Sequence, residues 1–309
     1  MNAVTLTDLG TAPALRAGVP APSPGPGEVL VRVRASSVNP VDNAIAAGVL
    51  KDMVEHELPI TLGRDYAGVV EQVGSGVSGF AVGDEVFGCV PAMTPKVRDG
   101  SWAELIVARE GGSIARKPDG VDVAIAGAAP LAAIAAMNAI DALALAQGRT
   151  LLIVGATGGV GSIAVQLAAA AGATVIAPAL PEDEDYLRDL GVADIPPREG
   201  DVAAAVRERH PDGVDALLDN VSYTPGAYDA ARKDGARVAS TNNAAGEGPG
   251  RTNVFAMSTA EELRRLGQLL DAGALRVHIQ DTYPLDQAVA AMNALATTHT
   301  RGKLAVQVA

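Results

Sequence analysis

The chain has 309 residues, of which 48% are hydrophobic and only 3% aromatic, and it carries a net charge of −12 at pH 7. This length can bury a full core and favours two domains over one. The excess of negative charge argues against nucleic acid or an anionic membrane as a partner.

The sequence carries no targeting or disulfide signal. Its first ten residues lack the basic start and apolar stretch of a signal peptide, and no uninterrupted apolar run reaches the length of a membrane span. The single cysteine, Cys89, rules out an internal disulfide and fits a reducing compartment. We therefore expect a cytoplasmic protein with no membrane partner.

The first 115 residues consist of short β-rich runs separated by turn clusters rather than by helices. Strands at this spacing predict an antiparallel, barrel-like domain. The runs are residues 29–34, 67–73, 85–90 and 103–108.

The pattern becomes helical after Gly120, with helices expected over residues 123–129 and 131–145. From Leu151 onward, apolar runs typical of strands buried on both faces alternate with helical segments, which predicts a doubly wound parallel sheet. The expected strands are residues 151–154, 174–177, 214–219 and 237–240, and the expected helices are residues 201–209 and 259–271.

A glycine-rich turn at residues 155–161 follows the first of these strands and opens a helix. Glycines at such a turn permit the sharp bend, let the backbone approach a pyrophosphate, and let the helix pack close to the strand. The helix N-terminus adds free N–H groups and a partial positive charge. The turn therefore predicts a dinucleotide site that contains Gly155, Thr157, Gly158, Gly159, Val160 and Gly161.

The last part of the chain is similar in pattern to the first. Beyond Gly273, short strands at residues 277–282 and 304–308 flank a helix at residues 285–295. We therefore expect one domain formed by residues 1–118 and 272–309, and a dinucleotide-binding domain formed by residues 119–271. A domain inserted in this way predicts a ligand cleft at the junction of the two.

We expect no metal. Zinc requires three or four Cys, His or carboxylate ligands that converge tetrahedrally. The single cysteine is interpreted as a small core residue of a strand. The histidines are scattered and lie at no ligand spacing: His56, His210, His278 and His299.

Seven motifs carry a family resemblance: PGPGEVLV at 24–31, SVNPVD at 37–42, LGRDYAGVV at 62–70, VGDEVFG at 82–88, GATGGVG at 155–161, GVDALLD at 213–219 and TRGKL at 300–304. In this order, over essentially the full length, they resemble the medium-chain dehydrogenase/reductase superfamily, and within it the zinc-free quinone oxidoreductase branch. The resemblance implies an α/β fold in which a doubly wound parallel-sheet (Rossmann) domain is inserted in a β-rich, GroES-like barrel domain. It also implies a homodimer.

The resemblance singles out Asn39. In zinc-dependent relatives a cysteine, a histidine and a second cysteine hold the catalytic metal. Their first two positions correspond to Asn39 and Arg64 here, and no cysteine remains for the third. The resemblance implies that Asn39 lies beside the nicotinamide and the substrate. The alternative is a turn residue before Pro40, a place that Asn favours.

Arg64 and Tyr66 are the other candidate catalytic residues. By resemblance, Arg64 would face the cleft, where a fixed cation could stabilise an enolate oxygen. Alternatively it forms an ion pair with Asp65 or Asp42, because an unpaired buried charge is costly. Tyr66 could donate a proton, or it could pack in its strand as tyrosines commonly do.

NADPH is the expected cofactor, and NADH is possible. NAD-specific sites place an acidic residue at the end of the second strand, whereas Ala179 stands there in this chain. The missing carboxylate leaves room for a 2′-phosphate. By resemblance, Arg198 falls near a position that relatives use to touch that phosphate. The acidic run at 182–185 argues for NADH. Further positions expected near the cofactor are Asn220, Val221, Ser240, Thr241 and Lys303.

The expected function is zinc-independent hydride transfer from NAD(P)H to a quinone or an α,β-unsaturated carbonyl, with donors around Asn39, and Arg64 or water, stabilising the oxyanion. Two hydroxyl-bearing positions common in the branch are Ala44 and Ala135 here. Two alternatives stay open, and the missing hydroxyls keep the second of them open. One is a pathway-specific enoyl or ketone reductase of specialised metabolism, and the other is a non-catalytic NADPH-binding protein with a structural or sensory role.

Overall fold

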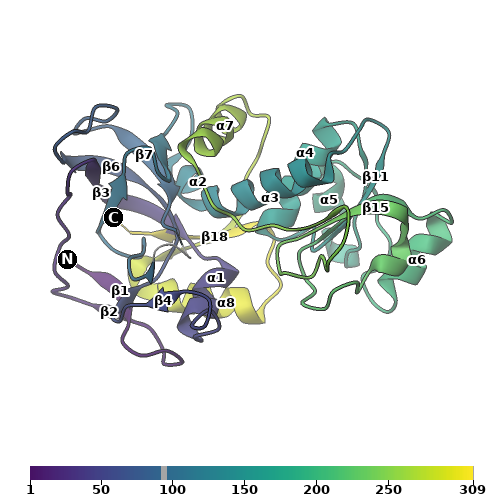
Figure 1. The fold of residues 1–309 in the computed structure, drawn as a ribbon, viewed down its shortest axis with the longest axis horizontal. Helices are drawn as coiled ribbons and strands as arrows, with labels where there is room; N and C mark the ends of the chain where they lie inside the picture. The colour runs from purple at the N-terminus through teal and green to yellow at the C-terminus, as the bar shows by residue number, and fades with distance from the viewer. Residues whose placement is uncertain (92–95, 309) are drawn as a thin grey trace. The chain divides into compact units, whose positions relative to one another are not determined.

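The computed structural model describes residues 1–91 and 96–308 and divides into two compact units (Figure 1). The β-rich unit comprises Met1–Leu131 and Met257–Ala309, and the α/β unit comprises Ala132–Ala256. The sequence predicted domain boundaries after residue 118 and before residue 272. They differ because α2 (Val123–Ala128) packs on strands β3 and β6, and α7 (Ala260–Asp271) packs near β10, so both helices belong to the β-rich unit.

The main sheet of the β-rich unit has seven strands in the order β10-β7-β6-β3-β18-β17, with β9 also paired to β3. All pairs are antiparallel except β17–β18, which is parallel because the helical segment η3 (Leu285–Gln287) and α8 (Ala288–Thr297) crosses over between them. The strands are β3 (Glu28–Ser37), β6 (Asp65–Val73), β7 (Glu85–Cys89), β9 (Leu105–Arg109), β10 (Ile114–Arg116), β17 (Ile279–Pro284) and β18 (Lys303–Gln307).

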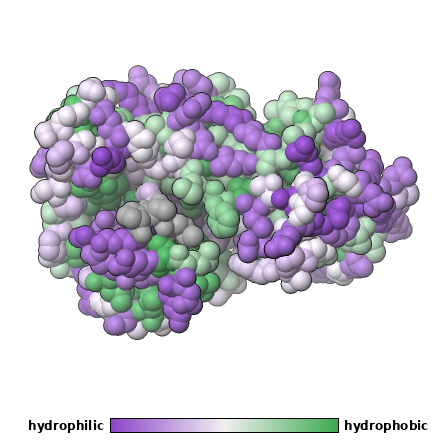
Figure 2. Space-filling view, viewed as in Figure 1, coloured by the Kyte–Doolittle hydropathy of each residue, from purple (hydrophilic) through white to green (hydrophobic). Residues whose placement is uncertain are grey.

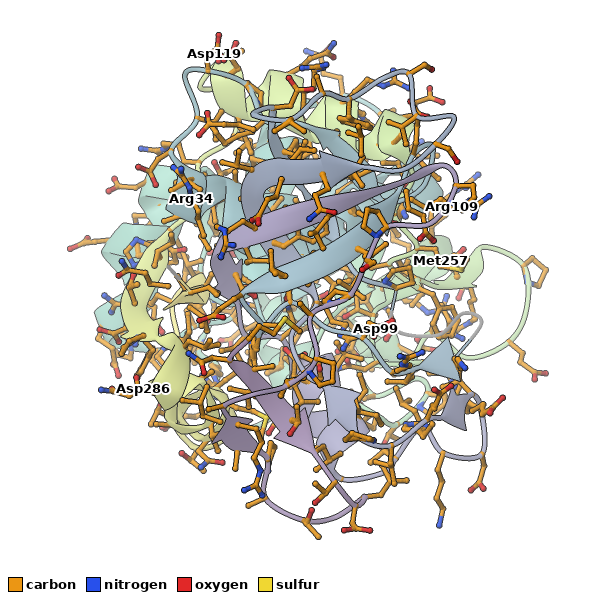
Figure 3. The ribbon with its side chains drawn as sticks, turned by 90° about the vertical axis from the view of Figure 1, so that its left-hand side faces the viewer. Arg34, Asp99, Arg109, Asp119, Met257 and Asp286 are labelled. Carbon is orange, nitrogen blue, oxygen red and sulfur yellow. The ribbon has the colours of Figure 1, made fainter. Side chains whose placement is uncertain are left out.

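Strand β3 is the centre of this sheet, because β6 pairs with one of its edges while β9 and β18 share the other. Its residues alternate: Val31 and Val33 are buried, whereas Arg32 and Arg34 are exposed (Figure 3 labels Arg34). The strand ends in two buried polar residues, Ser36 and Ser37, and the chain then enters the candidate site.

Smaller elements complete the β-rich unit around a second apolar core that includes Trp102, Ile45 and Leu62. Helix α1 (Pro40–Ala46) and α8 contribute to this core. The remaining strands form a three-stranded sheet and a two-stranded sheet. They are β1 (Ala3–Leu6), β2 (Ala14–Arg16), β4 (Glu55–His56), β5 (Ile60–Thr61) and β8 (Lys96–Val97).

The α/β unit contains a six-stranded parallel sheet in the order β13-β12-β11-β14-β15-β16. This order steps outward in both directions from β11, so the predicted doubly wound sheet is confirmed. The strands are β11 (Thr150–Val154), β12 (Thr174–Ile176), β13 (Val192–Asp194), β14 (Val214–Asp219), β15 (Arg232–Ser240) and β16 (Arg251–Asn253).

Helices flank this sheet. They are the last part of α3 (Pro130–Leu143), α4 (Gly159–Ala170), η1 (Pro181–Asp183), α5 (Glu184–Leu190), α6 (Val202–Arg209) and η2 (Asp229–Ala231). Of these, α3, α4 and α6 occur where the sequence predicted helices. Strands β13 and β16 were not predicted. Each has only three residues, and the polar Arg251-Thr252-Asn253 gives no apolar run to read.

The face of the molecule seen in Figure 2 is largely polar. Figure 2 shows hydrophilic residues over much of the visible face, with hydrophobic residues gathered on parts of the β-rich unit. Exposed apolar side chains of this unit include Val49 and Met53. In the portion of the chain that the structure describes, no helix is long and apolar enough to span a bilayer.

Candidate functional site

Asn39 stands at the junction between β3 and α1. The helix begins at Pro40, whose missing N–H is no loss at a first helical position. The Asn39 backbone N–H donates to Asp42 Oδ2 at 2.8 Å, which closes the first turn. Asn39 is therefore the N-cap of this helix, as the turn alternative required. Only 3% of its surface is exposed.

The Asn39 side chain is held at both ends. Its Nδ2 donates to Asp65 Oδ2 at 2.8 Å and makes a longer contact of 3.4 Å with Ser37 Oγ. Its Oδ1 accepts a hydrogen bond of 2.6 Å from Lys303 Nζ. Three separate strands, β3, β6 and β18, thus supply the partners of one amide group.

Asp65, the first residue of β6, is the hub of this network. Its carboxylate accepts hydrogen bonds from Ser37 Oγ at 2.6 Å, from Asn39 Nδ2, and from the backbone N–H of Leu131 at 2.7 Å, in the first turn of α3. Its Oδ2 also lies 3.5 Å from Lys303 Nζ. The sequence identified Asp65 only as a possible partner of Arg64, because its real partners come from distant segments.

Lys303 opens β18 and points inward, with 4% of its surface exposed. Besides Asn39 Oδ1, its Nζ donates to the backbone carbonyl of Val38 at 3.1 Å. Burial lowers the pKa of Lys303, and the negative charges of Asp65 and Asp42 oppose that shift. The three donors of the ammonium group are thus directed at three groups of its own unit, so the described contacts tie Lys303 to the network.

Arg64 and Asp42 form a second buried charge pair, in addition to that of Lys303 with Asp65. The Arg64 guanidinium donates to the carbonyls of Thr61 at 3.0 Å and Pro91 at 3.2 Å, and its Nε lies 3.9 Å from Asp42 Oδ1. Burial raises the pKa of Asp42 to about 6, and burial also lowers the pKa of Arg64. Both side chains are fully buried, which is the arrangement of the ion-pair alternative for Arg64.

Tyr66 lies in the core of the main sheet, with 1% of its surface exposed. Its hydroxyl donates to the carbonyl of Ser113 at 3.0 Å, and burial raises its pKa well above the ordinary value. A phenol that is already bonded to the backbone and reluctant to ionise is a poor proton donor. The contacts of Tyr66 are those of the packing alternative.

The glycine turn of the α/β unit has the geometry that close backbone approach requires. Gly155 has φ of +79°, and a Cβ on Gly161 would lie 2.1 Å from the Gly155 carbonyl oxygen, so helix and strand touch there. A Cβ on Gly158 would meet only one atom, at 3.7 Å, so this side of the turn is open. Gly158 caps α4 without any side-chain bond. The N–H groups of Gly159, Val160 and Gly161 therefore remain for an anion.

Polar groups gather where β14 and β15 end, next to this turn. Thr241 Oγ1 donates to Asn220 Oδ1 at 3.1 Å, and Asn220 Nδ2 donates to the carbonyl of Val154, the last residue of β11, at 3.3 Å. Ser240 Oγ accepts two backbone N–H bonds, and Val221 is half exposed. The structure therefore brings the predicted residues Asn220, Val221, Ser240 and Thr241 together with the glycine turn.

Ala179 and Arg198 lie side by side beyond the ends of β12 and β13. The Arg198 N–H donates to the Ala179 carbonyl at 3.2 Å, and the Arg198 side chain is exposed. Across residues 1–91 and 96–308, its guanidinium makes no ion pair or hydrogen bond. Of the opposing acidic run, Asp183 is buried in η1. The Arg198 guanidinium is therefore exposed, and its contact with a 2′-phosphate stays a prediction.

The described residues offer no zinc site. No group of three or more His, Cys, Asp or Glu within residues 1–91 and 96–308 could hold a metal. The two positions that the resemblance relates to metal ligands carry the amide of Asn39 and the guanidinium of Arg64, neither of which is a zinc ligand.

Comparison with known families and proteins gives consistent results. The alcohol dehydrogenase GroES-like domain matches residues 25–119, and a family described as zinc-binding dehydrogenase matches residues 190–306. The chain is 32% identical to 2-methylene-furan-3-one reductase from Solanum lycopersicum, over 99% of this chain and 79% of the relative. It is 31% identical to the chloroplastic NADPH-dependent alkenal/one oxidoreductase from Arabidopsis thaliana, with the same coverage.

Solved structures agree over the whole chain. The quinone oxidoreductase from Coxiella burnetii superposes with a TM-score of 0.88 at 28% identity and covers 100% of this chain and 99% of its own. The quinone oxidoreductase from Pseudomonas syringae gives a TM-score of 0.86 at 26% identity, covering 99% of each chain.

Proposed function

The chain belongs to the medium-chain dehydrogenase/reductase superfamily and to its quinone oxidoreductase branch, and from that premise we propose that it reduces a quinone or an α,β-unsaturated carbonyl with NADPH. The observation that carries this proposal is the open glycine turn at the start of α4, with its uncapped N–H groups. When bound there, NADPH supplies a hydride to an electron-poor carbon of the acceptor and leaves as NADP⁺.

In the α/β unit, the turn from Gly155 to Gly161 holds the pyrophosphate. Its backbone N–H groups and the positive end of α4 complement the negative charge. Arg198 binds the 2′-phosphate, because its exposed guanidinium is free and no carboxylate replaces Ala179. Asn220, Val221, Ser240 and Thr241 line the strand ends toward the nicotinamide half.

In the β-rich unit, Asn39 is the residue that acts at the reacting centre. Two carboxylates, an ammonium and a guanidinium are buried around it, although burying four charged groups costs far more than apolar packing would. Such clusters occur where a site needs fixed charges. Arg64 and Tyr66 support this centre without touching the acceptor, since their polar groups already bond to backbone carbonyls.

The enzyme works without zinc, for which the residues that the structure describes supply no ligand set. It acts as a homodimer, which rests on the family resemblance, and in the cytoplasm, where its buried free thiol, Cys89, would stay reduced.

The test begins with fluorescence titrations of NADPH and NADH, followed in the same sample by p-benzoquinone and methyl vinyl ketone. We expect NADPH to bind more tightly than NADH and to be oxidised when either acceptor is added. Binding without turnover of any quinone or enone would favour the sensory alternative. A lack of binding by both nucleotides would overturn the proposal.

A further inference from the structure

The amide of Asn39 can take only one orientation. As described, Oδ1 faces the Lys303 ammonium at 2.6 Å and Nδ2 faces the Asp65 carboxylate at 2.8 Å. Rotating the amide by half a turn would place its NH₂ group against an ammonium, which has no acceptor, and its oxygen against a carboxylate, which has no donor. Two charged groups of opposite sign therefore fix which atom of Asn39 lies on which side.

This orientation determines what Asn39 can offer to a ligand. Both hydrogens of Nδ2 are directed at atoms of the protein, Asp65 Oδ2 and Ser37 Oγ. Lys303 takes one lone pair of Oδ1, and an amide oxygen has two. The group that stays available is thus a hydrogen-bond acceptor, and the donor toward an oxyanion that the sequence suggested is already engaged.

We propose that Lys303 and Asp65 are positioning residues that act through Asn39, holding its amide so that Oδ1 presents an acceptor at the reacting centre. The inference rests on the proposed function and deepens it. Both residues come from strands of the main sheet. Their side chains form hydrogen bonds with the two ends of the Asn39 amide, Asp65 with Nδ2 and Lys303 with Oδ1. A centre held on strands is more rigid than one held on loops, and hydride transfer is sensitive to small displacements.

A merely structural lysine is the competing explanation, and the chain contains a matched control for it. Lys117 is also buried, with 8% of its surface exposed. Its Nζ donates to the carbonyls of Pro118 at 3.0 Å and Val121 at 2.8 Å, and it lies 3.2 Å from Glu85 Oε2. It thus has two carbonyls and a carboxylate as partners but no contact with Asn39.

The experiment is a double-mutant cycle on the full chain, measured with NADPH and methyl vinyl ketone. Lys303→Met should lower kcat roughly 10- to 100-fold, because a loosened amide misplaces the reacting groups. Asn39→Ala should lower it similarly, and the double variant should be no slower than Asn39→Ala alone, because Lys303 acts through that amide. Lys117→Met should leave kcat unchanged, although it lowers the melting temperature.

The dissociation constant of NADPH provides the second readout. We expect Lys303→Met to leave it within about twofold of the wild-type value, as for residues without direct contact. A large increase would show that Lys303 binds the cofactor itself and would overturn the inference. Effects of Lys303→Met and Asn39→Ala that multiply in the double variant would also overturn it, since they would act independently.

Two further outcomes separate this inference from the function on which it rests. If the wild-type protein oxidises NADPH with neither an enone nor a quinone, the proposed function fails. If it is active and Asn39→Ala is impaired while Lys303→Met is not, only the positioning inference fails. Should Lys303→Met not fold, Asp65→Asn carries the same test from the other end of the amide, with the same expected loss of kcat and the same lack of additivity.

Discussion

Lys303 donates a 2.6 Å hydrogen bond to Asn39 Oδ1, although 264 residues separate the two along the chain. Strand β18, which Lys303 opens, pairs with the end of β3, and Asn39 follows β3 directly. The C-terminal segment thus completes a polar network that the first 65 residues begin. The pairing of β18 with β3 therefore brings residues from both ends of the chain into one site.

Asn39→Ala should lower kcat roughly 10- to 100-fold, because the reacting groups lose their fixed partner. Binding of NADPH should persist, since the glycine turn is untouched. Steady-state kinetics with methyl vinyl ketone and a direct NADPH titration measure the two effects. Asn43→Ala is the matched control: Asn43 belongs to the same helix, and its side chain donates to the carbonyl of Met292 at 3.3 Å. Equal losses in the two variants would contradict a special role for Asn39.

Arg64→Met should destabilise the fold more than it affects cofactor binding. Removing the guanidinium leaves Asp42 buried beside two backbone carbonyls that have lost their donor, an effect on the order of 3 kcal/mol. Arg32→Ala removes an exposed pair with Glu71 and should cost below about 1 kcal/mol. Urea unfolding of both variants compares them. Similar unfolding free energies would show that the buried pair contributes no more than a surface one.

The Asp42 carboxyl should make stability fall as the pH rises toward 6. Burial raises its pKa from 3.8 to about 6, so the folded state holds a proton that the unfolded state has lost. Its contribution to the free energy of unfolding is complete below pH 3.8 and decreases as the pH rises through about 6. Asp42→Asn should flatten the decrease between those values, as measured by urea unfolding at several pH values. The same slope in the variant and the wild type would refute this assignment.

Arg198→Ala should weaken NADPH binding roughly 10- to 100-fold and leave NADH binding nearly unchanged, because a charge-assisted bond to the 2′-phosphate is lost. Parallel fluorescence titrations of the two nucleotides measure the difference. Arg188→Ala is the control, since Arg188 is an exposed residue of α5 near Glu184. A parallel loss of affinity for both nucleotides would place Arg198 elsewhere in the site.

Gly158→Ala should preserve the fold and abolish tight NADPH binding. A Cβ at this position meets only the Gly155 oxygen at 3.7 Å, so the chain accepts it, whereas it would project where the pyrophosphate must approach. Gly161→Ala should instead destabilise the α/β unit, because its Cβ would lie 2.1 Å from the Gly155 oxygen. Thermal unfolding and NADPH titration separate the two effects. Unchanged NADPH affinity in Gly158→Ala would locate the pyrophosphate somewhere else.

Sequence patterns predicted the fold well where structure is local. Residues 214–219 form β14 within the predicted bounds, because a strand buried on both faces reads as an apolar run. The glycine turn was equally clear from the sequence, because Gly155 adopts a positive φ and Gly161 lets the helix touch the strand. Strand β15 begins at Arg232, earlier than predicted, because Lys233, Asp234 and Gly235 carry no strand signal and the register shifts there.

The candidate site could be predicted only in part, because its contacts are distant in sequence. Asn39 and Arg64 stood out by resemblance, and the ion pair of Arg64 with Asp42 was one of the predicted alternatives. The role of Asp65 was missed, since Ser37, Asn39, Leu131 and Lys303 meet at it from four segments. No spacing rule relates such residues; only the pairing of β3 with β6 and β18 brings them together.

The central claim is that a hydride passes from NADPH to carbon, and isotope transfer tests it most directly. The wild-type protein is incubated with methyl vinyl ketone and NADPH that carries deuterium at both C4 positions, and the product is analysed by NMR. We expect butanone with one deuterium at the β-carbon and a solvent-derived proton at the α-carbon. Butanone without deuterium would contradict direct hydride transfer, and unreduced enone would contradict the reduction of α,β-unsaturated carbonyls by this chain.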